Sequence, residues 1–559
     1  MWHNLASWAA ASAVVQQVEA LVGRLVQVFR GSWLAVLLSA PWQERPPAYQ
    51  HSRVRSSVGW LLRTALRWRI PTAWLEGSWL LGRWPQWLWQ DLVWLWENSL
   101  LSGLWIGFGR WVLDDQWNQT EHEQASAPPL WRWLFYSLVL VALAAVSWQW
   151  PTMGQRAVKL LLFGVVLLLL WAEPTGTVYV AAFALPFLPV LSSAYLIAWG
   201  LLTSWIKGRL RIRSSLLLLM AAMLCIVLLL AAWHSTDVSH SLRYLRYYFA
   251  GLALLLLIDS HILTPRQLRQ LLAAALVAGA LAAFWGVAQY MLRFATDISW
   301  VDIRVSAITT RVIGPFDNPN MFAGYLVALL PFPLAAMIHS KTRLPVRLAN
   351  AALTGLLGLV LLLTFSRGAW LAAVAAGFVL AIYLQPRLFW AIPPLLLLAP
   401  WILPEVVWQR LASIVNLEDT SNMVRLHVWN SSLNMWLHNF WLGVGMGIAP
   451  FATIYPIFQY GIVPALHAHN LFLQVAVEGG VVALVAFLSF SLGLWQAAVS
   501  RWRLAPTLAV ATAAALAGQL AYGLFDYNWY DLRLLLLFWL LAGLVIVAYR
   551  QRTDEKVRP

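Results

Sequence analysis

AALTGLLGLVLLLTFSRGAWLAAVAAGFVLAIYL, residues 351–384, decides the fold of this chain, because it carries a single charge, Arg367, near its middle. At ~1.5 Å of rise per residue, one straight helix of this length would measure roughly 50 Å. The hydrocarbon core of a bilayer is only ~30 Å thick. The segment is therefore predicted to form two short membrane-spanning helices that meet at Arg367. A guanidinium at the membrane edge needs an anionic partner or contact with the polar interface.

Composition indicates the same class for the whole chain. Of its 559 residues, 61% are hydrophobic and 11% are charged, which is typical of an all-α polytopic membrane protein and excludes a soluble domain. The net charge of +15 collects in short loops and near the N-terminus. It is expected to set the topology and to contact anionic lipids, not nucleic acid. One cysteine, Cys225, excludes an internal disulfide and a thiolate metal cluster.

Three regions follow one another along the chain. Residues 1–130 are basic and rich in tryptophan, and their amphipathic stretches are predicted to lie on the cytoplasmic membrane surface. Residues 131–549 form the transmembrane domain, with about 12–14 predicted helices, and residues 550–559 form a tail. The run 177–206 contains Pro186 and Pro189, so it is either one broken span or two short helices. The other apolar runs lie near 134–150, 157–172, 215–233, 244–260, 270–292, 320–339, 348–366, 368–384, 388–403, 468–496, 506–524 and 533–549.

Lysine and arginine clusters between these runs predict the topology. Cytoplasmic loops collect such residues, which assigns 207–213, 340–347, 501–503 and the C-terminal tail to the inside. The alternation then puts 293–319, Arg367, 404–467 and 525–532 outside. The N-terminus is expected to be cytoplasmic, and the protein is predicted to span the plasma (inner) membrane many times.

The external loop 404–467 is the one long polar segment between predicted spans, and such loops are usually functional. Ser421 or Asn422 can cap a helix that runs to about Leu437. Four side chains share one face of this helix at helical spacing. They are Arg425, Trp429, Ser432 and Trp436.

Four motifs in order along the chain resemble the O-antigen ligase/Wzy superfamily of bacterial membrane glycosyltransferases. They are RVIGPFDNPNMFAGYL at 311–326, SRGAW at 366–370, RLHVWNSSLNMWLHNFWLGVGMG at 425–447, and HAHNLFLQ at 467–474. The resemblance covers about residues 300–545. It implies a GT-C-like helical architecture with one large periplasmic loop. Within the superfamily the chain looks most like the cyanobacterial branch labelled inorganic carbon transporter B.

The resemblance implies transfer of a glycan from an undecaprenyl-diphosphate donor to a glycan or lipid acceptor hydroxyl, with no metal or other cofactor. Carried over by motif, Arg367 and Arg425 bind the diphosphate and His469 is the general base. Arg311 is expected near the same external site and is a further candidate diphosphate ligand. The chemistry agrees with these assignments. The planar arginine fork can stabilise a diphosphate leaving group without a metal ion. A histidine can accept the acceptor's proton near neutral pH.

Other polar residues in these motifs have simpler interpretations. His427, His438 and His467 are predicted to be structural, and Asn318 and Asn320 to form the turn before a span. The pair Glu418–Asp419 fits a capping role. Glu478, roughly 13 Å beyond His469 along a helix, is a candidate intramembrane acid.

Two other functions compete with glycan transfer. The branch label favours a bicarbonate transporter, and a third possibility is a membrane protein that has kept the fold without activity. Ion-coupled transporters usually place several ionisable groups at mid-membrane. Here Glu478 is the clear deep candidate, whereas Arg367, Arg425 and His469 are predicted to be external. This pattern favours chemistry at the outer face, by an enzyme that is either a ligase or a polymerase.

Overall fold

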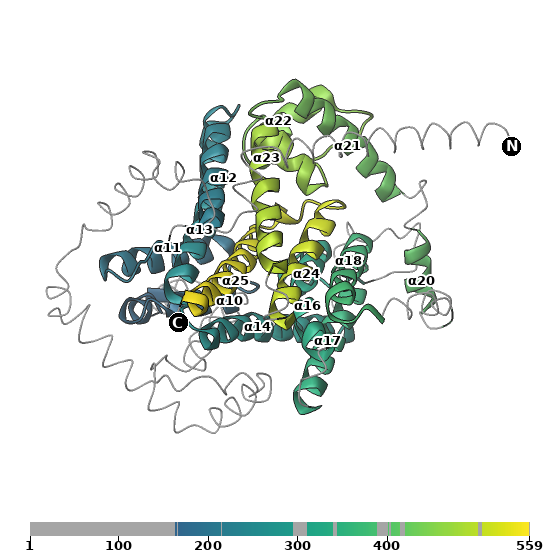
Figure 1. The fold of residues 1–559 in the computed structure, drawn as a ribbon. Helices are drawn as coiled ribbons and strands as arrows, with labels where there is room; N and C mark the ends of the chain where they lie inside the picture. The colour runs from purple at the N-terminus through teal and green to yellow at the C-terminus, as the bar shows by residue number, and fades with distance from the viewer. Residues whose placement is uncertain are drawn as a thin grey trace, which may run out of the picture. The chain divides into compact units, whose positions relative to one another are not determined.

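The computed structural model describes residues 163–164, 166–213, 215–293, 310–338, 344–387, 401, 404–413, 420–500 and 506–557. The chain divides into two compact units, residues 1–68 and 69–559, and all described residues lie in the second unit. In this described part there are helices and no strands (Figure 1), so the predicted all-α class is confirmed. The predicted N-terminal surface region, the run 134–150 and almost all of 388–403 lie outside the described residues.

The predicted break at Arg367 is confirmed. Helix α17 (Leu344–Leu363) ends just before it, and α18 begins with it (Arg367–Leu384). Between them Phe365 has a φ of 50°, in the left-handed region that interrupts a right-handed helix. The hydroxyl of Thr364 donates to the Leu361 carbonyl at 2.6 Å, which satisfies one of the acceptors left open at the end of α17.

Eight helical segments in the described residues are long and apolar enough to cross a membrane. Besides α17 and α18 they are α12 (Leu216–Trp233), α13 (Val238–His261), α14 (Pro265–Met291), α15 (Pro319–Leu329) with α16 (Pro331–Ile338), α23 (Leu471–Val499) and α25 (Leu532–Val557). Three further apolar helices near the predicted runs do not meet this criterion of length and hydropathy. They are α10 (Gly176–Ala184), α11 (Val190–Ile206) and α24 (Pro506–Gly523). The run 177–206 is therefore two helices, and α25 extends the last span through most of the predicted tail.

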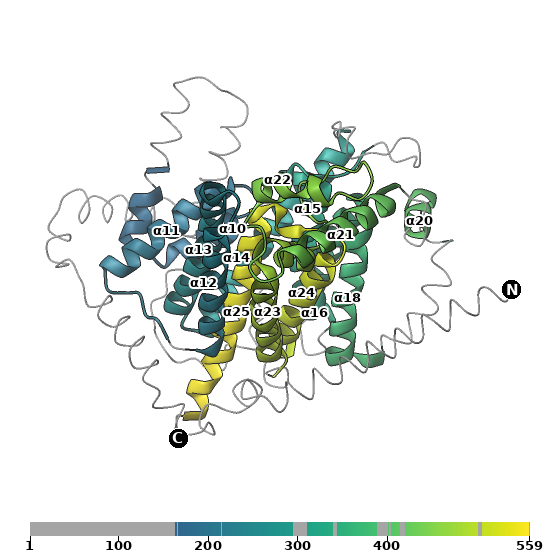
Figure 2. The same ribbon diagram turned by 90° about the horizontal axis from the view of Figure 1, so that it is seen from above.

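Pairs of helices that are distant in sequence pack against each other. Helix α18 packs on α24, α13 on α25, and α12 on α23, and Figure 2 shows most of these helices side by side. Gly368 allows the start of α18 to approach the end of α24, because a Cβ there would lie 2.8 Å from Phe525. This contact brings Arg367 close to the short connection between α24 and α25.

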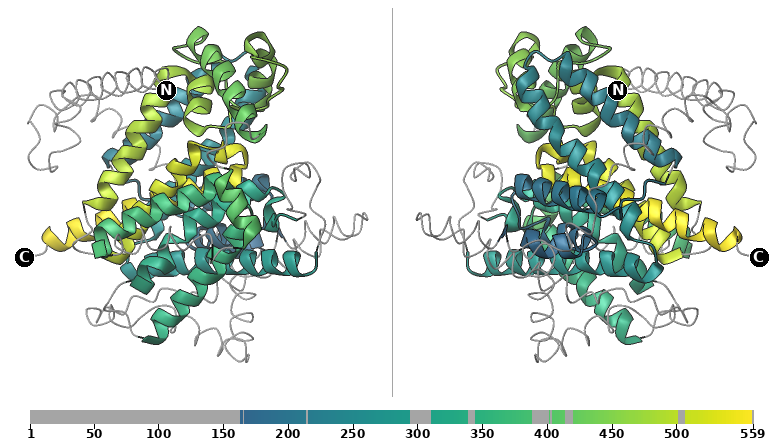
Figure 3. Two further views of the ribbon diagram at one scale, coloured as in Figure 1. Left: turned by 90° about the vertical axis from the view of Figure 1, so that its right-hand side faces the viewer. Right: turned by 90° about the vertical axis from the view of Figure 1, so that its left-hand side faces the viewer.

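The predicted external loop contains three helices, α20 (Glu405–Ala412), α21 (Thr420–His438) and α22 (Ile448–Phe458). Helices α21 and α22 gather beside one end of α23 in both views of Figure 3. The helix predicted to end near Leu437 is present, but it begins at Thr420, so neither Ser421 nor Asn422 is its N-cap. The Asn422 amide instead contacts residues outside its own helix, including Arg367.

Candidate active site

Helix α21 connects the two motifs that precede and follow it. The Asn422 side chain accepts from Arg367 Nη2 at 3.4 Å, and the Trp429 indole donates to the His469 carbonyl at 3.2 Å. Arg425 lies between these two contacts, three residues after Asn422 and four before Trp429, so the three share one helix face. The structure thus brings Arg367, Arg425 and His469 to the same face of α21.

His469 is fixed at the entrance to α23. Its backbone has a φ of 47°, which is uncommon for a residue with a side chain and often marks a functional position. Its N–H donates to His467 Nδ1 at 3.2 Å. The next residue, Asn470, caps α23 by accepting from the Leu473 N–H at 3.0 Å. The backbone on both sides of the His469 ring is therefore held in place.

The ring of His469 pairs with a carboxylate from the connection after α24. His469 Nδ1 lies 3.3 Å from Asp526 Oδ1, and the side chains are 32% and 4% exposed. Burial alone would raise the pKa of the Asp526 carboxyl, but the hydrogen bond and charge of His469 and the charge of Arg425 hold it well below its usual range. An ionised Asp526 favours the His469 tautomer in which Nδ1–H donates to the carboxylate and the lone pair lies on Nε2. This is the arrangement that a general base needs.

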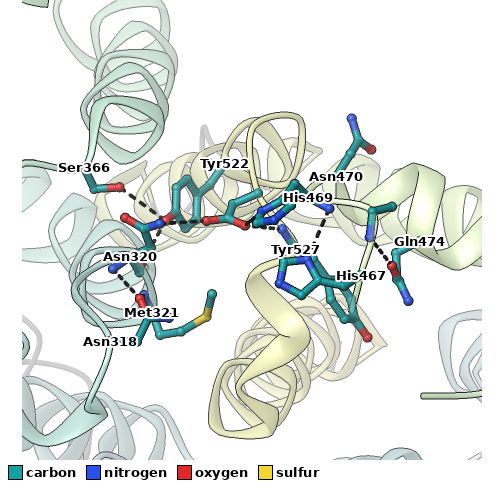
Figure 4. Close-up of polar contacts among 12 residues, drawn as sticks. Asn318, Asn320, Met321, Ser366, His467, His469, Asn470, Gln474, Tyr522 and Tyr527 are labelled. Carbon is teal, nitrogen blue, oxygen red and sulfur yellow. Dashed lines mark hydrogen bonds and ion pairs between the residues drawn. The ribbon is translucent and has the colours of Figure 1, made fainter. Parts of the chain in front are cut away.

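Asp526 is itself held on both oxygens. Oδ1 also accepts from the Tyr527 N–H at 2.9 Å, and Oδ2 accepts from Asn320 Nδ2 at 3.1 Å. Figure 4 shows Asn320 and Tyr522 on one side of this network, with His467 and His469 on the other. The sequence analysis missed Asp526. The available signal was its position in the connection 525–532, which the charge pattern had assigned to the same membrane face as His469.

Three arginines belong to the same group of contacts: the charge of Arg425 acts on Asp526, Arg311 reaches Asp526 through Asn320, and Arg367 contacts α21 through Asn422. Arg367 is buried, and its Nη1 donates to the carbonyl and hydroxyl oxygens of Ser413 at 2.9 and 2.8 Å. The Nε of Arg425 is buried and has no hydrogen-bond partner among the described residues. Burial lowers the pKa of Arg311 to about 9, so this guanidinium remains cationic at neutral pH. Arg311 donates through Nε to the Thr364 carbonyl at 2.8 Å.

Glu478 is buried inside α23. Its Oε1 accepts from Gln474 Nε2 at 2.9 Å and from the Gly447 N–H at 3.1 Å. The neighbouring Val444 N–H donates to the Val477 carbonyl at 2.9 Å. These bonds attach the segment between α21 and α22 to α23. In the described structure Glu478 therefore has a local anchoring role.

The three histidines that were predicted to be structural have local contacts. The His427 ring lies 5.4 Å from the Tyr460 ring, and the His438 ring lies 4.8 Å from the Phe458 ring. His467 lies closer to the site, with its ring 4.1 Å from the His469 ring. Burial and the charge of His469 lower the pKa of His467 to about 3, so His467 is neutral at physiological pH.

His467, His469 and Asp526 have ligand atoms within 4.8 Å of one another, a spacing that could hold a metal ion. Hydrogen bonds already use several of the lone pairs that a metal ion would need. His467 Nδ1 accepts from a backbone N–H, and both oxygens of Asp526 accept from protein donors. A metal ion would have to displace these bonds, so the donor set fits an orienting pair better than a metal centre.

Comparison with known proteins gives one family match. A search of curated proteins finds no match. A family model described as O-antigen ligase matches residues 352–488, the part of the chain from α17 into α23. The matched range includes Arg367, Arg425 and His469, whereas Arg311, Asn320 and Asp526 lie outside it. The match covers about a quarter of the chain, and over these residues the chain is similar to O-antigen ligases.

Proposed function

We propose that the protein transfers a glycan from a polyprenyl-diphosphate carrier to an acceptor hydroxyl at the periplasmic face of the inner membrane. The family match supports glycan transfer in general. The observation that carries the more specific proposal is the His469–Asp526 pair, in which a reachable imidazole is hydrogen-bonded to a buried carboxylate beside Arg425. Such a pair provides a base of fixed tautomer next to a cationic group.

In the proposed step the acceptor hydroxyl oxygen attacks the anomeric carbon of the donor glycan. The bond between that carbon and the diphosphate oxygen breaks, and the diphosphate leaves with the electron pair. The hydroxyl proton passes to Nε2 of His469, whose Nδ1–H remains hydrogen-bonded to the Asp526 carboxylate. The buried carboxylate stabilises the imidazolium that forms and holds its ring in orientation.

The leaving diphosphate gathers negative charge, which Arg367 and Arg425 stabilise in this proposal. Arg425 offers a buried Nε–H that has no partner in the described structure. Arg367 donates to the neutral oxygens of Ser413, and a diphosphate oxygen is a stronger acceptor than these. Arg311 is the third cation proposed for this end of the site, and it is more buried than Arg425.

Deleting the gene and restoring it in the same cells tests the proposal. We expect the deletion to change surface polysaccharide and to cause the lipid-linked donor to accumulate. Wild-type protein should restore both, whereas His469→Ala should restore neither. Unchanged surface polysaccharide together with reduced bicarbonate uptake would support the transporter function instead.

The proposed membrane face has its own test. If the site is external, the basic stretch before α17 is cytoplasmic. A Lys341→Cys variant should then resist an impermeant thiol reagent in spheroplasts and react after lysis. Labelling in intact spheroplasts would show that the predicted topology is inverted.

A further inference from the structure

Asn320 makes a contact that its position at the start of a helix does not require. The turn is already stabilised by Asn318, which caps α15 by accepting from the Asn320 N–H at 2.9 Å and from the Met321 N–H at 3.4 Å. The Asn320 side chain is therefore available for other contacts. Its Nδ2 donates to Asp526 Oδ2 at 3.1 Å, across 206 positions of sequence.

A buried cation holds the other end of this amide. Arg311 Nη2 donates to Asn320 Oδ1 at 2.9 Å, and Arg311 Nε donates to the Thr364 carbonyl at 2.8 Å. This fixes which end of the amide faces Asp526, because Oδ1 accepts from the guanidinium and Nδ2 must then point the other way. The Tyr522 hydroxyl also donates to the Asn320 backbone carbonyl at 2.9 Å.

We infer that Asn320 and Arg311 are positioning residues for His469, acting through Asp526. This inference rests on the proposed function of His469 as a base. Arg311 orients the Asn320 amide, the amide occupies Oδ2 of Asp526, and Oδ1 remains directed at His469 Nδ1. Asn320 thus contributes to the proposed reaction through Asp526, without touching the substrate.

Chemical reasoning explains why both oxygens of Asp526 need a partner. A carboxylate whose second oxygen lacks a partner in a buried site can lower its energy by turning toward other donors. The alternative donor here is the Tyr527 N–H, which already shares Oδ1 with His469. Removing the Asn320 amide should therefore let Asp526 rotate, and the His469 ring would lose its orientation.

A double-mutant cycle tests this inference with purified protein in nanodiscs. The variants are Asn320→Ala, Asp526→Asn and the double mutant. Transfer is measured with lipid-linked donor extracted from cells that lack the gene, and affinity is measured with undecaprenyl diphosphate. Asn318→Ser, which keeps a capping hydroxyl, is the matched control. Asn320→Asp provides an isosteric second variant if Asn320→Ala does not fold.

We expect Asn320→Ala to lower kcat by about 10- to 100-fold, the range typical for groups that orient a functional histidine. KM and the undecaprenyl diphosphate affinity should stay within about twofold. Since Asn320 acts through Asp526, adding Asn320→Ala to Asp526→Asn should cause little further loss. Asn318→Ser should behave like wild type.

Two results would overturn the inference in different ways. If His469→Ala is inactive but Asn320→Ala and Asn320→Asp keep the wild-type kcat, or if the losses multiply, Asn320 does not act through Asp526 and the proposed function stands. If His469→Ala transfers at the wild-type rate, the proposed function fails and the positioning role fails with it.

Discussion

At one end of the site His469 is held by its backbone, its ring and an anionic partner that is itself fixed on both oxygens. At the other end Arg367 donates to Ser413, and Arg425 has a buried Nε–H that lacks a partner among the described residues. The base is thus preorganised, whereas the cationic end has hydrogen-bonding capacity that a ligand can use. This difference suggests that the ligand completes the cationic end and finds the base already in place.

The largest expected effect comes from removing the base. His469→Ala should lower transfer on the order of 10²–10⁴-fold, the usual range for general-base assistance, while undecaprenyl diphosphate binds almost as well as to wild type. Transfer and binding are measured on the same preparation. His438→Ala is the matched control, because this exposed histidine contacts Phe458 and Asn434 within its own region. If His469→Ala transfers glycan at the wild-type rate, His469 is not the base, and the contrast between the two ends of the site fails.

The cationic end should respond in binding as well as in rate. Arg425→Lys keeps the charge but loses the planar fork, so we expect about 10²–10³-fold slower transfer, as for loss of one oxyanion donor, and weaker undecaprenyl diphosphate binding. Arg367→Lys should also lower the free energy of unfolding by about 1–2 kcal/mol, because its guanidinium bonds Ser413 within the fold. The control is Arg347→Lys, at an exposed position of α17. Equal binding by all three variants would contradict a diphosphate role.

The sequence predicted one of these ends better than the other. Hydropathy and length predicted the break at Arg367, and helical spacing predicted the face that carries Arg425. Both signals are local. Asp526 and Asn320 join the site through contacts that span 57 and 206 residues, and no local period marks such pairs. The interpretation of Asn320 as a turn former described its backbone, whereas its side chain could be assigned only after α15 and α24 were placed together.

A smaller effect concerns stability near the base. His467 has a folded-state pKa of about 3 against an ordinary value of 6.5. Between these values only the unfolded chain binds the proton, so stability falls as pH drops from about 6.5, by at most about 1.4 kcal/mol per unit. The depressed pKa of Asp526 lowers the stability of the fold only below about pH 4, where the carboxyl of the unfolded chain takes up its proton.

The variant His467→Asn isolates this contribution. An asparagine oxygen can replace Nδ1 as the acceptor for the His469 N–H, but it does not titrate. Between pH 7 and pH 5 its thermal midpoint should therefore fall less than that of wild type. Differential scanning fluorimetry in detergent measures both midpoints. An equal fall in the two proteins would mean that His467 is not held neutral by the fold.

The smallest expected effect is that of removing metal ions. His467, His469 and Asp526 are spaced closely enough for a metal, but the lone pairs of His467 Nδ1 and of the Asp526 oxygens already accept hydrogen bonds. A divalent cation bound through His469 Nδ1 would also have to break the hydrogen bond between this nitrogen and Asp526. We therefore expect dialysis against a chelator to leave the transfer rate within about twofold, and added Zn²⁺ not to raise it, since arginine supplies the positive charge. Loss of transfer on chelation with recovery on Zn²⁺ would instead make this cluster a metal centre, and His469 would then be a ligand and not the base. Asp526→Asn separates the two cases further, because a metal centre would lose its bound ion, as measured by elemental analysis, whereas an orienting pair would lose only rate.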